Sequence, residues 1–246
     1  MARVDITKKT ALVTGANKGI GLEAARQLAQ RGFTVWLGSR DRARGEAAVE
    51  ELAADGDVRL VDLDVTDADS VRAAAERVAE ETGALDVLVN NAGAAVAAGE
   101  GRPSTVQLDT IRQTFDVNLY GTLRVTQAFL PLVRRAPAGR IVNVSSTLGS
   151  LTTVASEGNP FGQMPFFAYP ASKTVLNALT AWLAVELKGT PIKVNSVCPG
   201  SNSTDMNPDP DAQHPAEGAE VVVRAATLAA DGPTGSFFDA NGAVAW

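Results

Sequence analysis

Short apolar runs alternate with longer amphipathic stretches along nearly the whole chain. Ile20, Ala24 and Leu28 repeat at i, i+4 and i+8, so they share one helix face, and the pattern predicts a helix over 19–30. The short apolar runs are typical of strands. The predicted strands are 11–13, 33–37, 58–65, 85–89, 141–144 and 192–197, with 236–238 as a candidate seventh, and the other predicted helices are 42–54, one around 71–78, 105–135 and 169–188.

The order of strand then helix repeats, which predicts a parallel sheet with right-handed crossovers. No break in composition and no internal repeat marks a second domain. We therefore expect an α/β protein with a single domain over residues 1–246.

Two stretches, 151–167 and 201–215, fit neither pattern and are rich in small polar residues, glycine or proline. Both follow predicted strands, and ligands of open α/β sheets bind beyond the carboxyl ends of the strands. We expect these two loops to form the walls of a substrate pocket. The alternative is that they are ordinary surface loops.

The 246 residues carry a net charge of −6, which argues against nucleic acid as a partner and leaves no basic patch for a membrane surface. No apolar run is long enough to span a bilayer, and no signal peptide is visible. Cys198 is the only cysteine, so no internal disulfide forms, which fits a cytoplasmic protein. With His214 as the only histidine, a zinc site built on those ligands is excluded, and we expect no metal.

A glycine-rich segment lies between the first predicted strand and the first predicted helix. Gly15, Gly19 and Gly21 let the backbone turn tightly and approach a pyrophosphate, while the helix N-terminus supplies N–H donors. The spacing is G-x-x-x-G-x-G, and the alternative is a simple turn. The candidate cofactor-binding residues of this segment are Gly15, Asn17, Lys18, Gly19, Ile20 and Gly21.

The end of the second predicted strand discriminates between the two nicotinamide cofactors. An acidic residue there binds the ribose 2′-hydroxyl of NAD, whereas an Arg accommodates the 2′-phosphate of NADP. Arg40 follows Ser39, and Arg44 lies one helical turn further on. Together with Lys18 these cations predict NADP(H). Asp41 lies one place past the usual acidic position, and the alternative for both arginines is a solvated helix start.

Tyr169 and Lys173 stand four residues apart, so on a helix their side chains point into one site. A free Tyr has a pKa of about 10, and a nearby cation favours the phenolate and lowers that pKa. We therefore expect the pair to act as a general acid/base unit whose Tyr169 pKa is lowered by Lys173.

These features, together with Asn90-Asn91-Ala92-Gly93 and in this order along the chain, resemble the short-chain dehydrogenase/reductase family over nearly the whole length. The resemblance is strongest to the carbonyl reductase branch. It implies a Rossmann-like, doubly wound parallel sheet of about seven strands in the order 3-2-1-4-5-6-7. It also implies an NADPH-dependent carbonyl reductase that is reversible to an alcohol dehydrogenase.

Further site residues are implied by matching motifs of the family. Asp64 would meet the adenine ring, and Asn90 would lie by the ribose and nicotinamide. Pro199, Gly200 and Thr204 match the loop that holds the carboxamide end of the cofactor. The implied catalytic residues are Asn118 as a proton relay, Ser146 (selected over Ser145 by the pattern Ser-x-x-Gly), Tyr169 and Lys173.

The chain departs from the family pattern in three places. Ser146 and Tyr169 are 23 positions apart, wider than is usual, and these extra residues would obstruct packing between subunits, so we expect a monomer or dimer. Pro170 is tolerable only in the first turn of a helix. The residues 201–203, Ser-Asn-Ser, replace a bulky aromatic residue, which predicts a roomier pocket.

The substrate is expected to be a small carbonyl compound or alcohol. The loop before Tyr169 carries four apolar side chains, which predict a hydrophobic wall and hence neutral, hydrophobic ketones or aldehydes as substrates. Two alternatives are an NADP-binding redox sensor without turnover and an enoyl reductase of the same fold, whose Tyr–Lys spacing is longer. We interpret Cys198 as a buried, inert thiol and His214 as a solvated loop residue. The four apolar residues are Phe161, Met164, Phe166 and Phe167.

Overall fold

The apolar runs form eight strands of one sheet in the order β3-β2-β1-β4-β5-β6-β7-β8. The computed structural model describes residues 8–246. Seven strands are parallel, and β8 pairs antiparallel with β7 at one edge. The predicted order of the first seven strands is therefore confirmed, and the eighth extends it. The strands are β1 (Thr10–Thr14), β2 (Thr34–Ser39), β3 (Val58–Asp62), β4 (Val87–Asn90), β5 (Arg140–Val144), β6 (Lys193–Val197), β7 (Ser236–Asp239) and β8 (Gly242–Ala243).

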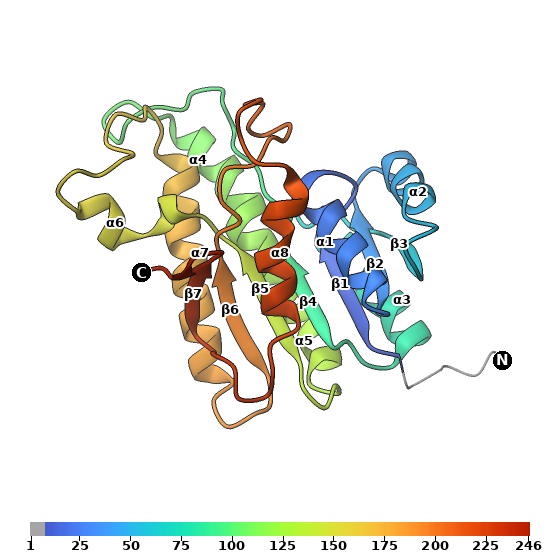
Figure 1. Cartoon of the computed structure of the whole chain (residues 1–246). Helices are drawn as coiled ribbons and strands as arrows, with labels where there is room; N and C mark the ends of the chain where they lie inside the picture. Colours follow the sequence, from blue (N-terminus) through green and yellow to red (C-terminus); the bar gives the residue numbers. More distant parts are fainter. Residues whose placement is uncertain (1–7) are drawn as a thin grey trace.

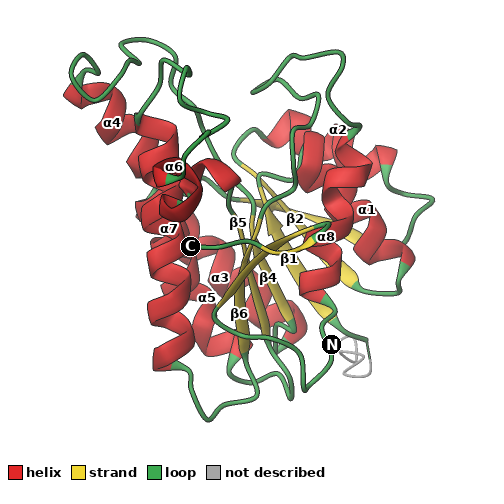
Figure 2. Cartoon of the chain, turned by 60° about the vertical axis from the view of Figure 1, so that its left-hand side comes forward, coloured by secondary structure: helices red, strands yellow, loops and turns green. Residues whose placement is uncertain are grey.

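Helices cover both faces of the sheet (Figure 1). Figure 2 shows α1, α2 and α8 on one side and α5 and α7 on the other. None of the helices within residues 8–246 combines the length and the apolar character needed to cross a membrane. The helices are α1 (Gly19–Gln30), α2 (Arg42–Glu51), α3 (Ala68–Thr82), α4 (Leu108–Phe115), the π-helix η1 (Asp116–Gly121), α5 (Thr122–Val133), the 3₁₀ turn η2 (Thr147–Gly149), α6 (Leu151–Ala155), α7 (Ala168–Glu186) and α8 (Pro215–Ala226).

Two hydrophobic clusters sandwich the sheet because successive strand residues point to opposite faces. In β1, Ala11 and Val13 pack in the cluster beneath α1 and α8, whereas Leu12 packs in the cluster with α3 and α5. All five residues of β1 are buried. Strands buried on both faces explain why the chain reads there as continuous apolar runs instead of an alternating pattern.

Several element predictions were wrong in detail. The predicted strand 58–65 ends at Asp62, and the predicted long helix 105–135 begins at Leu108 and is interrupted by η1. The loop 151–167 contains the short helix α6. Sequence analysis missed α8, although Pro215 occupies its first turn, where proline is common. His214, interpreted as a loop residue, is exposed and is the N-cap of α8, with a reciprocal capping box to Glu217.

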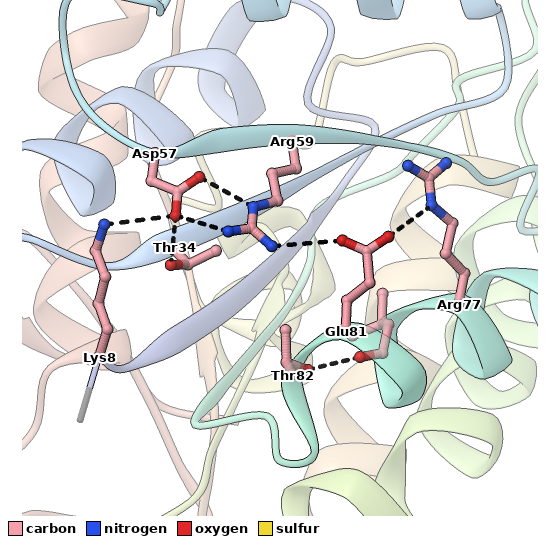
Figure 3. Close-up of polar contacts among 8 residues, drawn as sticks. Lys8, Thr34, Asp57, Arg59, Arg77, Glu81 and Thr82 are labelled. Atoms are coloured by element: carbon pink, nitrogen blue, oxygen red, sulfur yellow. Dashed lines mark hydrogen bonds and ion pairs between the residues drawn. The ribbon is translucent and has the colours of Figure 1, made fainter. Parts of the chain in front are cut away.

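Figure 3 shows a network of charged side chains at the edge of the sheet, and two of its arginines also lie over the buried Trp36 of β2. The guanidinium groups of Arg59 and Arg77 lie 5.8 and 5.5 Å from the centroid of the Trp36 ring. Arg59 also pairs with Asp57 at 3.0 Å and with Glu81 at 3.4 Å, and Glu81 pairs in turn with Arg77 at 3.4 Å. The network thus connects β2 and β3 to α3 at the edge of the sheet.

We predict that Arg59→Ala lowers the unfolding free energy by about 1–2 kcal/mol, because it removes a cation–π contact and two ion pairs at once. The matched control is Arg72→Ala, since Arg72 is exposed and pairs only with Asp69 among the residues described; its loss should stay within about 0.5 kcal/mol. Urea unfolding measures both variants. Equal losses would contradict the role given to Arg59.

Candidate active site

The predicted site residues gather at one edge of the sheet because the parallel strands all end there. The glycine segment follows β1, the Asn90 segment ends β4, Ser146 follows β5, and Pro199 follows β6. Ligands of open α/β sheets bind at this edge. Two hollows elsewhere on the described surface, one between α1 and α8 and one between α3 and α5, include none of these residues.

The glycine segment forms a turn that only small residues fit. Gly15 and Gly19 have φ angles of +62° and +57°, in the left-handed region that glycine adopts without strain. A Cβ on Gly15 would lie 2.9 Å from the Ala92 backbone, and one on Gly21 would lie 2.4 Å from the Asn91 side-chain nitrogen. The segment therefore packs directly against the chain that follows β4.

The N-terminus of α1 offers donors to an anion. Its N-cap residue, Lys18, has an extended backbone and makes no capping hydrogen bond, and the first turn contains no acidic residue. The free N–H groups and the helix dipole together favour a phosphate. The uncapped helix and the close-packed glycines thus fit a dinucleotide.

The two asparagines after Val89 have different partners. Asn90 is buried, and its amide donates to Asn143 and Thr126 at 2.8 and 3.1 Å, so its side chain turns into the layer beneath α5. Asn91 instead donates to the carbonyl oxygens of Thr14 and Gly15 at 2.9 and 3.2 Å. The Asn90 side chain therefore faces the core at the end of β4, and the expected position of Asn90 beside the ribose and nicotinamide stays a prediction. Asn91, which sequence analysis missed, holds the glycine segment.

The end of β2 presents cations to the same edge. Arg40 is exposed and forms no ion pair among residues 8–246. Asp41 is the N-cap of α2: its carboxylate accepts from the Arg44 N–H at 3.1 Å and pairs with the Arg44 guanidinium at 3.4 Å. This local use explains the acidic residue that complicated the NADP prediction.

Lys18 bridges the glycine segment to the loop 201–215. Its ammonium forms an ion pair with Asp205. The hydrogen bond from Lys18 lowers the pKa of the Asp205 carboxyl, which favours its charged form. Both side chains are largely exposed. Thr204 lies beside the same segment, since a Cβ on Gly19 would come within 3.4 Å of its methyl group.

Tyr169 and Lys173 lie in the first turns of α7, as predicted. The Lys173 Nζ atom is 5.5 Å from the centroid of the Tyr169 ring and donates to the Val144 carbonyl oxygen at 2.8 Å. Lys173 is only 4% exposed, whereas Tyr169 stays partly accessible. Since α7 begins at Ala168, Pro170 falls within its first turn, where a missing N–H is tolerated.

The expectation that Lys173 lowers the pKa of Tyr169 was wrong. Burial raises the pKa of Tyr169 above its usual value, with a smaller contribution from Cys198. Burial also lowers the pKa of Lys173 to about 8, against an opposing contribution from Cys198. The Lys173 ammonium donates to the Val144 carbonyl oxygen, and no hydrogen bond joins it to the Tyr169 hydroxyl among the described residues.

Asn118 sits in the π-helix η1 and is 1% exposed. Its side chain exchanges two hydrogen bonds with the Ala94 backbone, at 2.8 and 2.9 Å, and donates to Ser172 at 2.9 Å. A Cβ on Gly93 would lie 3.5 Å from the Asn118 oxygen and 3.7 Å from the Lys173 Nζ. Asn118 and Lys173 therefore flank the same glycine.

Ser146 is the N-cap of η2, and its oxygen accepts from the Leu148 N–H at 3.2 Å. Its hydroxyl proton remains available as a donor. Ser145 is buried, which agrees with selecting Ser146 for the site. Cys198 is buried, as expected, and its sulfur accepts from the Thr147 N–H at 3.3 Å, so the thiol supports the same turn.

The loop 201–215 folds onto itself. Asn202 is 4% exposed and donates to the carbonyl oxygens of Pro199 and Gly200, both at 3.0 Å. The Asn202 side chain therefore packs within its own loop, and the roomier pocket expected at 201–203 stays a prediction. Gly200 has a φ of +78°, and a Cβ there would meet Gln213 at 2.8 Å.

The loop 151–167 keeps its apolar residues at the surface. Met164 is 41% exposed, and Phe161, Phe166 and Phe167 are partly exposed, so none of the four belongs to the buried core. This position suits a pocket wall better than ordinary packing.

Asp64, the residue expected at the adenine ring, forms hydrogen bonds within its own turn. One of its carboxylate oxygens accepts from the Thr66 N–H and hydroxyl at 2.9 and 2.7 Å.

Comparisons with known proteins agree with this geometry. Residues 9–214 match the family described as short chain dehydrogenase, and the chain belongs to this family. Among curated relatives, (+)-neomenthol dehydrogenase of Arabidopsis thaliana is 36% identical over 286 aligned positions, covering 94% of this chain and 96% of the relative. Carbonyl reductase 1 of Bos taurus, named as an NADPH enzyme, is 37% identical over 275 positions, covering 96% of this chain and 98% of the relative.

Two solved structures are similar over nearly their whole length. The NADPH-bound carbonyl reductase from chicken fatty liver has a TM-score of 0.85 and 27% identity, covering 97% of this chain and 99% of that chain. Salutaridine reductase from Papaver somniferum has a TM-score of 0.81 and 32% identity, covering 95% and 100%.

We predict that the low pKa of Lys173, about 8, makes stability depend on pH. An unfolded lysine titrates near 10.4, so between about pH 8 and 10.4 the unfolded state binds more protons and the unfolding free energy rises with pH. In Lys173→Met the rise from about pH 7 to 9.5 should be smaller by about 2 kcal/mol. The raised pKa of Tyr169 acts in the opposite direction only as the pH approaches about 10 and above.

Urea unfolding at several pH values measures this difference. Lys188→Met is the matched control, because Lys188 is exposed just past the end of α7. The control should keep the wild-type slope. A wild-type slope in Lys173→Met as well would show that Lys173 titrates normally in the folded protein.

Proposed function

We propose that this chain is an NADPH-dependent carbonyl reductase, reversible to an alcohol dehydrogenase. The observation that carries the proposal is the position of Tyr169 beside Lys173, whose Nζ atom lies 5.5 Å from the phenol ring centroid, at the sheet edge that also carries the glycine segment and Ser146. The relatives named as carbonyl reductases and neomenthol dehydrogenases support the same chemistry and argue against a sensor without turnover.

The cofactor fits the residues at this edge. The α1 N-terminus would hold the pyrophosphate, and Arg40, Arg44 and Lys18 would meet the 2′-phosphate. Asp64 would lie at the adenine, while Pro199, Gly200 and Thr204 would support the carboxamide. When bound, NADPH supplies a hydride to the substrate carbonyl carbon.

The side chains of the site handle the proton and the carbonyl oxygen. Tyr169 donates its proton to the developing alkoxide as the general acid. Ser146 donates a hydrogen bond to the same oxygen and stabilises its charge. Lys173, with a pKa near 8, returns a proton towards Tyr169, and Asn118 completes the path to solvent.

The substrates we propose are neutral, hydrophobic ketones or aldehydes. The partly exposed apolar residues of the loop 151–167 support this, since ligand sites combine apolar walls with a few orienting polar groups. We further propose that the enzyme is one domain and acts in the cytoplasm. The expected monomeric or dimeric state stays a prediction.

We predict that Tyr169→Phe lowers kcat for ketone reduction by at least about 10²–10⁴-fold, because it removes the transferable proton and keeps the ring. Oxidation of NADPH, followed by absorbance with a panel of ketones, measures the effect. NADPH binding, followed by fluorescence titration, serves as the control and should persist. Turnover near that of the wild type would refute the role of Tyr169.

We also predict that Arg40→Asp reduces the preference for NADPH over NADH by about tenfold to a hundredfold in kcat/KM, since a charge-assisted contact with phosphate contributes about 1.5–3 kcal/mol. Arg31→Asp makes the same change of charge at the exposed end of α1 and should leave the ratio unchanged. An unchanged ratio in Arg40→Asp would mean that other residues select the cofactor.

A further inference from the structure

Glu100 reaches from the loop after β4 to the start of α7. One of its carboxylate oxygens accepts from the backbone N–H groups of Phe167 and Ala168, at 2.9 and 3.1 Å, and from its neighbour Gly101 at 3.0 Å. The residue is partly buried and lies 67 positions before Phe167 in the sequence. Nothing in the sequence analysis had marked it.

These bonds complete the N-terminus of α7. The first N–H groups of a helix have no partner within the helix and need a cap. The N-cap residue Phe167 supplies no side-chain bond of its own, while Asp41, Asp67, Ser150 and His214 each cap their own helices.

Glu100 serves the free donors at the very start of this turn. It accepts from the N–H groups of Phe167 and Ala168, and the Tyr169 N–H also contributes to lowering the pKa of its carboxyl. Pro170, the next residue, has no N–H to satisfy. A single carboxylate therefore caps the turn that carries Tyr169.

We propose that Glu100 is a positioning residue, which fixes the first turn of α7 and thereby the direction of the Tyr169 side chain toward the substrate carbonyl. This rests on the proposed function, in which Tyr169 is the general acid. Because Phe167 ends the loop 151–167, Glu100 also fixes one end of that loop.

The segment that carries Glu100 is itself anchored. The Gln107 N–H donates to the Gly99 carbonyl at 2.9 Å, and the Thr110 hydroxyl donates to the Ala98 carbonyl at 2.6 Å. Gly99 has a φ of +73°, and a Cβ there would lie 2.7 Å from the side chains of Gln107 and Thr110. The loop is thus bound to the start of α4, which packs against α7 (Figure 2).

The charge of Glu100 suits this role. Burial acts to raise the pKa of the carboxyl, but the N–H groups of Phe167, Gly101, Ala168 and Tyr169 hold the pKa below its usual range. The carboxylate is therefore charged at neutral pH, where it makes charge-assisted bonds and interacts favourably with the helix dipole.

The test compares Glu100→Ala and Glu100→Gln with Asp86→Ala. Asp86 is a matched control, since its carboxylate also accepts from a distant backbone N–H, that of Thr10 at 2.8 Å, but at the opposite end of the sheet. Three quantities are measured: amide hydrogen exchange at 167–169, kcat with a neutral ketone, and the dissociation constant of NADPH.

We expect Glu100→Ala to speed exchange at these amides and to lower kcat about tenfold to a hundredfold, while NADPH binding changes less than about threefold. Glu100→Gln keeps an acceptor oxygen without the charge and should restore kcat to within about fivefold of the wild type. Asp86→Ala should destabilise the protein without changing kcat or exchange at 167–169.

Unchanged amide hydrogen exchange at 167–169 in Glu100→Ala would show that Glu100 does not cap α7, whatever the activity of that variant. Faster exchange with a kcat equal to that of Asp86→Ala would overturn the positioning role. If Glu100→Ala does not fold, Glu100→Gln decides: a small rise in exchange at 167–169 together with a fall in kcat of up to about fivefold supports the inference, and a change in only one of the two overturns it. The exchange measurement is independent of turnover, so a failure of the proposed function, seen as full activity in Tyr169→Phe, is distinguishable from a failure of this inference.

Discussion

Backbone pairing between seven parallel strands fixes where the chemistry of this protein lies. Parallel pairing makes every strand end at the same edge, so segments separated by more than a hundred residues meet there. Burial of the strands on both faces holds that edge rigid. The reactive side chains are held directly by these strands. Ser146 lies two residues past the end of β5, and Lys173 donates to the carbonyl oxygen of Val144, the last residue of that strand.

Local patterns predicted what depends on local geometry. The spacing of Tyr169 and Lys173 places both on one helix face, and positions such as Gly15 require glycine because of their own backbone angles. Apolar runs located the strands because their residues are buried on both sides. By contrast, α8 was missed because its N-terminal cap depends on a histidine, whose side chain seldom signals a helix start.

What could not be predicted depends on contacts across the fold. The direction of Asn90 is set by Asn143 and Thr126, which only the packed sheet brings near. The pKa of Lys173 follows from its burial, and burial of one side chain cannot be read from spacing along a helix. Glu100 is the clearest case, since it accepts from the backbone N–H groups of Phe167 and Ala168. Nearly every residue type has a backbone N–H, so the identities of these two residues do not indicate the contact.

The π-helix that holds Asn118 has a consequence for insertions and deletions. A π turn accommodates one residue more than an α turn, so the residues after it are rotated by about 100° relative to an unbroken α-helix. Loss of a single codon within 116–118 would let the helix run on as α, and a different side chain would then take the place of Asn118 opposite Ala94. Relatives of this chain should therefore tolerate length changes in 151–167 far more readily than in this short segment.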